Sequence, residues 1–162
     1  MSEPILSIDG EVHRPRTFSF ESLLSFPATF QIADISRIDP KRKGDAVMLE
    51  ALLALAAPKE TATYLTLHAS ADDFHASIPL EAVRNQALLI YGLHGQPLPA
   101  SAGGPVRFFI PNFAACHTAE VDECSNVKFV DRIELTAGRG QDNRPPDEGT
   151  HAALHEKERT QN

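Results

Sequence analysis

Residues 103–111 read Gly103-Gly104-Pro105-Val106-Arg107-Phe108-Phe109-Ile110-Pro111, and their apolar part predicts a short strand bounded by two prolines at residues 106–110. A second stretch, Asn126-Val127-Lys128-Phe129-Val130-Asp131-Arg132-Ile133-Glu134-Leu135, predicts the last strand at residues 127–135. Between them lies a long polar loop at residues 112–126 that holds both cysteines of the chain.

Working toward the N-terminus, apolar runs of strand length alternate with short helical patterns. Ser19 is placed to cap a short helix over residues 20–24, and Asp45 to cap a helix over residues 46–57 that ends before Pro58. Strands are predicted near residues 5–8, 29–35, 63–69, 74–78 and 87–93, with a helical turn over residues 79–84. Without regular βαβ alternation, the pattern predicts the α+β class, with mixed β-sheets and short helices in one domain.

Length and charge narrow the function classes. The chain has 162 residues, which fits one ordinary domain, and a formal net charge of −7, which argues against nonspecific binding to nucleic acid or to an anionic membrane. No apolar run has the length of a membrane helix, and the N-terminus does not resemble a signal peptide, so we expect a cytoplasmic protein. From composition, residues 1–137 are predicted to form the domain and residues 138–162 a disordered tail.

Six segments in order resemble the molybdopterin-binding domain of the sulfite oxidase family. They are Leu6–Val12 (a strand that reaches a glycine), Phe18–Leu24 (the first helix), Ala71–Leu80, Leu93–Leu98 (an "NG" turn with His94 in place of asparagine), Gly103–Pro111 ("G.PlRlvvP") and Asn126–Leu135 ("s.KWv.rIel"). The resemblance extends over about residues 6–135 and implies the sulfite-oxidase-type molybdopterin-binding fold.

This resemblance also implies which residues bind the cofactor. Glycines let a backbone approach a ligand closely, and arginine forms charge-assisted bonds with phosphate, so Arg107 and Lys128 are expected near the pterin phosphate. The full implied set is Arg107, Lys128, Ser125, Asn126, Gly104 and His75. The alternative is that Arg107 and Lys128 are solvated or are paired with acidic side chains.

The chain departs from the family at the metal ligand. The family carries a cysteine on the segment after the first helix, whereas residues 30–37 here contain none, and Ala33 or Asp34 falls near the expected position. Asp34 is a candidate metal ligand, although a carboxylate is harder than a thiolate and would change the metal's electronics. The chain also contains no tryptophan, and the family's tryptophan-rich segment is missing.

The polar loop offers a second candidate ligand, Cys116. It lies beside His117 and eight residues before Cys124, a spacing that matches no common zinc pattern. Three interpretations stay open: incidental thiols on a surface loop, a disulfide, and Cys116 as a replacement ligand for molybdenum.

Two main functions follow from these observations. The first is a degenerate domain that binds a pterin or another small anionic ligand without sulfite oxidase turnover. The second is a small molybdenum-dependent oxidoreductase with an altered metal ligand. A third hypothesis is a purely structural domain that assembles with a partner protein. The resemblance implies molybdopterin or the molybdenum cofactor, and a domain without either is an equal alternative. The sequence leaves enzymatic activity and oligomeric state open.

Overall fold

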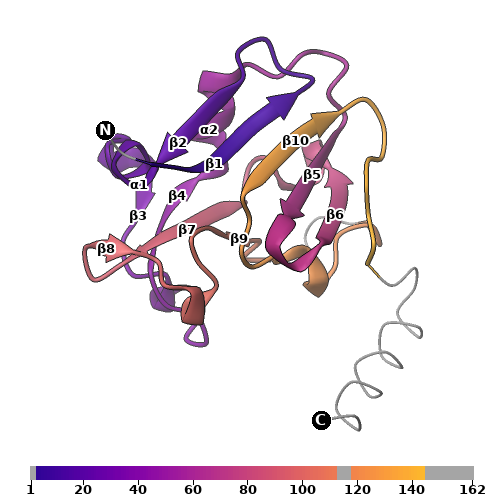
Figure 1. The fold of residues 1–162 in the computed structure, drawn as a ribbon. Helices are drawn as coiled ribbons and strands as arrows, with labels where there is room; N and C mark the ends of the chain where they lie inside the picture. The colour runs from indigo at the N-terminus through magenta and orange to yellow at the C-terminus, as the bar shows by residue number, and fades with distance from the viewer. Residues whose placement is uncertain (1–2, 113–117, 145–162) are drawn as a thin grey trace, which may run out of the picture.

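The computed structural model describes residues 3–112 and 118–144 and divides their strands between two sheets (Figure 1). The first sheet contains, in spatial order, β2 (Arg16–Ser19), β1 (Pro4–Gly10), β10 (Arg132–Thr136), β5 (Tyr64–Ala69) and β6 (Phe74–Pro79). Its central pair, β1 and β10, is parallel, and the other neighbours are antiparallel. The first and last strands of the domain are therefore hydrogen-bonded to each other.

The second sheet is built around β7 (Leu88–Leu93). It contains β3 (Gln31–Ile32), β4 (Asp45–Met48), β7 and β8 (Gln96–Pro97) in that order, and β9 (Arg107–Phe109) also pairs with β7. Its neighbours are antiparallel throughout. Two mixed or antiparallel sheets with short helices confirm the predicted α+β class.

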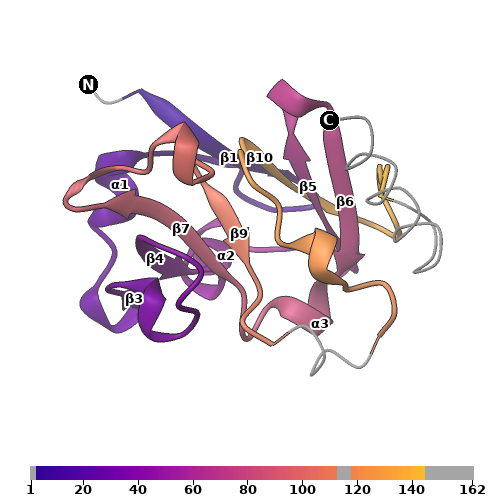
Figure 2. The same cartoon turned by 90° about the horizontal axis from the view of Figure 1, so that it is seen from below.

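The continuous apolar run of β7 is explained by burial of both of its faces. Side chains alternate along a strand, so Leu89 and Tyr91 join the main core while Leu88 and Ile90 join a second, smaller cluster. The main core lies between the two sheets and includes helix α2 (Leu49–Ala56), which Figure 2 shows between them. The smaller cluster contains Ile35, Ala46, Leu88, Ile90, Leu98 and Phe109.

Three predicted elements differ in extent from the structure. The strand predicted over residues 127–135 begins only at Arg132, because Phe129 has a positive φ of 60° that interrupts extended backbone. The helix predicted from residue 46 begins at Leu49, because Ala46 and Val47 pair with Ile90 and Leu89 of β7 as strand β4. The strand predicted over residues 29–35 is reduced to β3, since Asp34 has a positive φ of 56° and begins a 3-10 turn.

The helix predicted at residues 20–24 is confirmed as α1 (Phe20–Leu24), and its predicted cap is present. The Ser22 amide donates to Ser19 Oγ (3.1 Å), and the Ser19 amide donates to Ser22 Oγ (2.6 Å). The predicted helical turn over residues 79–84 appears as α3 (Leu80–Val83), beside β6. Among the described residues, no helix combines the length and apolar character required to cross a membrane.

The described structure continues past residue 137. Residues 138–144, here called the C-terminal strap, lie against β6. The Gly140 amide donates to Ser77 Oγ (2.8 Å), and the Asn143 amide donates to the His75 carbonyl (3.0 Å). Composition alone placed this segment in a tail, because its order depends on partners that are distant in sequence. Residues 145–162 lie outside the described residues.

Candidate functional site

Gly103 and Gly104 form the turn that leads into β9. A Cβ atom on Gly104 would lie 1.8 Å from the Leu98 carbonyl oxygen, so only glycine fits there, and the Gly104–Pro105 peptide is cis. Gly103 has a φ of 99°, a conformation that favours glycine. The glycine pair is thus required by close backbone packing as well as by the turn.

The turn is joined to the segment that carries Lys128. The Phe129 amide donates to the Gly103 carbonyl (2.9 Å), and the Val130 amide donates to the Val106 carbonyl (2.8 Å). A Cβ atom on Gly103 would lie 3.1 Å from Arg107 Cδ and 3.3 Å from Lys128 Cγ. Two motifs separated by fourteen residues in the sequence, 112–125, therefore place their basic side chains over the same glycine.

Arg107 lies partly buried beside this turn. Its Nε is buried and has no hydrogen-bond partner among the described residues. Burial, followed by the nearby charge of Arg42, lowers the pKa of Arg107 below its ordinary value, and Asp39 opposes this only in part. A partly buried guanidinium with an unbonded nitrogen leaves a donor available to an anion.

Arg42 completes the basic cluster. Its Nε lies 3.0 Å from Asp39 Oδ2, and its guanidinium carbon lies 4.8 Å from the centroid of the Phe109 ring. Phe109 is two residues beyond Arg107 on β9 and so shares its face of the strand. We call Gly103, Gly104, Arg107, Lys128 and Arg42 the candidate anion site. Sequence reasoning missed Arg42, because a Lys-Arg-Lys run in a turn resembles any solvated basic loop.

Asp34, the candidate metal ligand, is exposed at the start of a 3-10 turn. Its Oδ1 accepts hydrogen bonds from the Ser36 amide (3.2 Å) and the Ser36 hydroxyl. The Ser36 hydroxyl is the main cause that lowers the pKa of Asp34, and Arg37 and His94 add smaller effects. The carboxylate is therefore ionised, and part of its bonding capacity is used by its own turn.

The other candidate ligand, Cys116, lies outside the described residues. Within residues 3–112 and 118–144, no three His, Cys, Asp or Glu side chains are grouped so that they could hold a metal ion.

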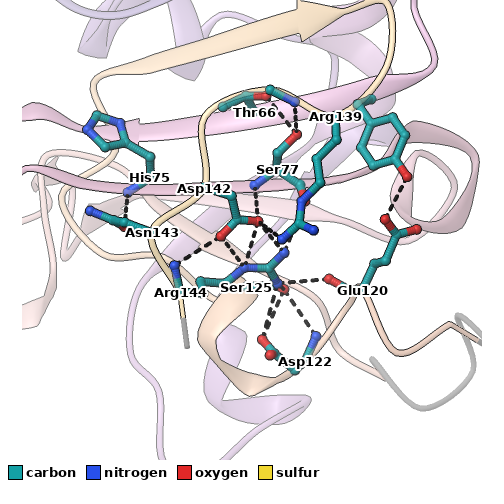
Figure 3. A network of polar contacts seen from close by, with 12 residues as sticks. Thr66, His75, Ser77, Glu120, Asp122, Ser125, Arg139, Asp142, Asn143 and Arg144 are labelled. Atoms are coloured by element: carbon teal, nitrogen blue, oxygen red, sulfur yellow. Dashed lines mark hydrogen bonds and ion pairs between the residues drawn. The ribbon is translucent and has the colours of Figure 1, made fainter. Parts of the chain in front are cut away.

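Ser125 and Asn126, both in the implied cofactor set, form internal hydrogen bonds. Asn126 Oδ1 accepts from the Ile110 amide (2.7 Å) at the end of β9. Ser125 is fully buried, and its Oγ accepts from the Asp122 amide (3.1 Å) and from Arg144 Nη1 (2.8 Å). The structure places Ser125 in a polar network with the strap (Figure 3).

Arg144 is the centre of that network. Its Nη2 donates to Asp142 Oδ2 (2.6 Å) and to the Ser77 carbonyl (3.0 Å), and its Nε donates to Asp142 Oδ1 (3.0 Å). Burial alone would raise the pKa of Asp142, but hydrogen bonds from Arg144 and from the Ser77 amide hold it below its ordinary value. Asp142 likewise raises the pKa of Arg144 against the effect of burial. This network binds the strap to β6.

His75, the last residue of the implied set, is buried on β6 and faces His68 on β5 (Nδ1 to Nδ1, 2.8 Å). Its other ring nitrogen lies 2.9 Å from Asp73 Oδ1. Of the six implied cofactor residues, the structure therefore brings together Arg107, Lys128 and Gly104, whereas His75, Ser125 and Asn126 have partners elsewhere in the fold.

Comparison with known proteins agrees with this architecture. The crystal structure of the sulfane dehydrogenase SoxCD from Paracoccus pantotrophus matches with a TM-score of 0.59 and 24% sequence identity. The match covers 83% of this chain and only 38% of the SoxCD chain, so it supports the fold alone. No curated protein matches the chain. The family model of the oxidoreductase molybdopterin-binding domain matches residues 4–143. The chain therefore belongs to the oxidoreductase molybdopterin-binding domain family, to which the sulfite oxidase type of domain belongs.

Proposed function

We propose that this domain binds a pterin cofactor, or another small anionic ligand, at the candidate anion site, and that it does so without ordinary sulfite oxidase turnover. The observation that carries the proposal is the buried, unbonded Nε of Arg107 beside Arg42 and Lys128. Arg42 and Arg107 share one nearby carboxylate, Asp39, so a phosphate would supply further negative charge and acceptors.

The described residues fit the phosphate of a molybdenum cofactor better than they fit its metal. Arg107 and Lys128, whose side chains pack over Gly103, would hold the phosphate. When bound, a molybdenum cofactor supplies oxygen-atom transfer coupled to two-electron redox change. At the position where the family has a thiolate, however, this chain has Ala33 or Asp34. The missing thiolate supports loss of turnover, and the cations of the candidate anion site support retention of binding.

A small molybdenum-dependent oxidoreductase with an altered ligand is the second candidate. The ionised carboxylate of Asp34 favours it, because an anionic oxygen ligand can bind a hard, high-valent metal. Cys116 stays the alternative ligand within this second proposal. The cytoplasmic location also stays a prediction, since it rests on sequence alone.

The test is the molybdenum and pterin content per chain after expression in a host that makes the cofactor. Pterin that is bound in the wild type and in Arg84→Met, but lost in Arg107→Met, would support the proposed site. Arg84 is a suitable control because it is an arginine on the surface, paired with Glu81.

The same measurement separates the two functions. Pterin without molybdenum supports the binding domain. Molybdenum near one atom per chain, lost in Asp34→Ala or in Cys116→Ser, would instead establish the altered-ligand enzyme. Absence of both pterin and molybdenum from the wild type would contradict both forms of the cofactor proposal.

A further inference from the structure

Four side chains form a continuous line across the first sheet, outside the candidate anion site. His68 on β5 and His75 on β6 are opposite each other in the strand register, and their Nδ1 atoms are 2.8 Å apart. His68 Nε2 lies 3.0 Å from Glu134 Oε1 on β10, and His75 Nε2 lies 2.9 Å from Asp73 Oδ1. Both histidines are buried, with 5% and 8% of their surface exposed.

Counting hydrogens determines the charge of this line. The contact between the two Nδ1 atoms requires one N–H, since two lone pairs at 2.8 Å repel. Each Nε2 also requires a hydrogen, because a carboxylate can only accept. The line therefore needs three ring protons, whereas two neutral imidazoles carry two. We propose that His68 and His75 form a buried dyad that shares one extra proton, and hence one positive charge, between Glu134 and Asp73.

The charges around the dyad are compatible with this assignment. On β10, Glu134 faces His68, and Arg132 lies 3.5 Å from the other oxygen of Glu134 while its Nε lies 2.9 Å from Asp9. Asp131, which precedes β10, accepts from the Ser70 amide and hydroxyl. On the strap, Arg139 and Arg144 both pair with Asp142. The carboxylates therefore outnumber the cations near the dyad.

The geometry limits both gain and loss of protons. A fourth ring proton would put a hydrogen on both Nδ1 atoms. The two N–H groups would then repel each other across 2.8 Å. Removal of the third proton would leave a lone pair facing a carboxylate. That loss falls on His75, because the side chain of Asp73 is 91% exposed and can turn toward water, whereas that of Glu134 is 28% exposed.

The strap lies next to the same pair of residues. The Asn143 side-chain amide donates to the Asp73 carbonyl (2.6 Å), and Asn143 Oδ1 accepts from the His75 amide (2.9 Å). Asn143 thus holds the backbone of Asp73 and His75 in place, and the Asp73 carboxylate remains free to turn.

The direct test is nitrogen NMR of the histidine rings in the full chain. At pH 7.5 we expect three of the four dyad nitrogens to show protonated-type shifts, or the two Nδ1 atoms to share an intermediate shift. His13 and His94, which are exposed and lie outside the dyad, provide reference signals in the same spectrum. Two unprotonated-type nitrogens in the dyad at pH 7.5 would overturn the proposal. Loss of the respective signals in His68→Gln and His75→Gln provides the assignment.

A second test uses Asp73→Asn, with Asp72→Asn as its matched control. Asparagine tolerates the positive φ of 49° at residue 73 and can donate to an unprotonated Nε2, so the extra proton is no longer needed. An unfolded histidine holds one ring proton above about pH 7.5. The wild-type folding constant should therefore fall about tenfold more per pH unit than that of Asp73→Asn above this pH. Asp72→Asn should behave as the wild type.

Equal pH slopes for Asp73→Asn and Asp72→Asn would contradict the shared proton. If Asp73→Asn does not fold, the NMR result decides independently.

Discussion

Two arginines of this chain, Arg107 and Arg144, differ in how fully their guanidinium groups are hydrogen-bonded. Arg144 is buried, and all three of its guanidinium nitrogens donate to acceptors from β6, the strap and the segment around Ser125 (Figure 3). Arg107 is half-buried beside another cation, and its buried Nε has no partner among the described residues. Arg144 therefore serves the fold, whereas Arg107 is the arginine to which the proposed function assigns ligand binding.

The largest effect is expected for Asp142→Asn. Arg144 would keep its charge in a buried site without its main counter-ion, which costs about 3–5 kcal/mol of unfolding free energy. Urea denaturation measures this loss. The double variant Asp142→Asn with Arg144→Met should recover part of it, because the buried charge is then removed. A loss below about 1 kcal/mol in Asp142→Asn would show that the pair is not needed.

A chain ending at residue 137 should be destabilised less than Asp142→Asn, although it loses the entire strap. Truncation removes both members of the pair, and the remaining groups of β6 can bond to water. We expect a loss of about 2–3 kcal/mol from several hydrogen bonds worth about 1 kcal/mol each. The control is a chain ending at residue 144. Equal urea midpoints for the two truncated chains would mean that the strap adds no stability.

Acid should reduce the contribution of Asp142 in a defined direction. Its folded pKa lies below its ordinary value of about 3.9, so the stabilisation is complete above that pH and is lost as the pH falls through the folded pKa. The difference in stability between wild type and Asp142→Asn should therefore shrink below about pH 4. Urea titrations at a series of acidic pH values measure it, and a difference that grows on acidification would be inconsistent with the lowered pKa.

The smallest effect on stability is expected for Arg107→Met. No hydrogen bond within the described residues is lost, and repulsion from Arg42 is relieved, so the unfolding free energy should change by less than about 1 kcal/mol. Arg84→Met is the control in the same denaturation experiment. A loss above about 2 kcal/mol would show that Arg107 is a structural residue like Arg144.

The fold could be predicted from the sequence because its signals act between near neighbours and occur in a recognisable order along the chain. The cap at Ser19 and the prolines around Val106–Ile110 act within a few residues, and the order of the six segments supplied the topology. Helix α2 was started too early because Val47 fits either a helical stripe or a strand, and only its pairing with Leu89 decides.

The candidate anion site was predicted in part. Arg107 and Lys128 belong to recognisable segments, whereas Arg42 is placed by its contacts with Asp39 and Phe109, which no local pattern encodes. The strap was missed for a similar reason. Its Gly-, Asp- and Arg-rich composition is typical of tails, and its order comes from acceptors more than sixty residues away on β6.

The position of β10 has a consequence for synthesis of the chain. This strand lies at the centre of the first sheet, between β1 and β5, yet among the described strands it is the last to leave the ribosome. Until about residue 136 emerges, β1 and β5 each lack a neighbour along one edge. At about 5–20 residues per second, that interval lasts several seconds. Unpaired edges are where nascent chains associate wrongly, so this domain depends on its final strand for safe folding as well as for stability.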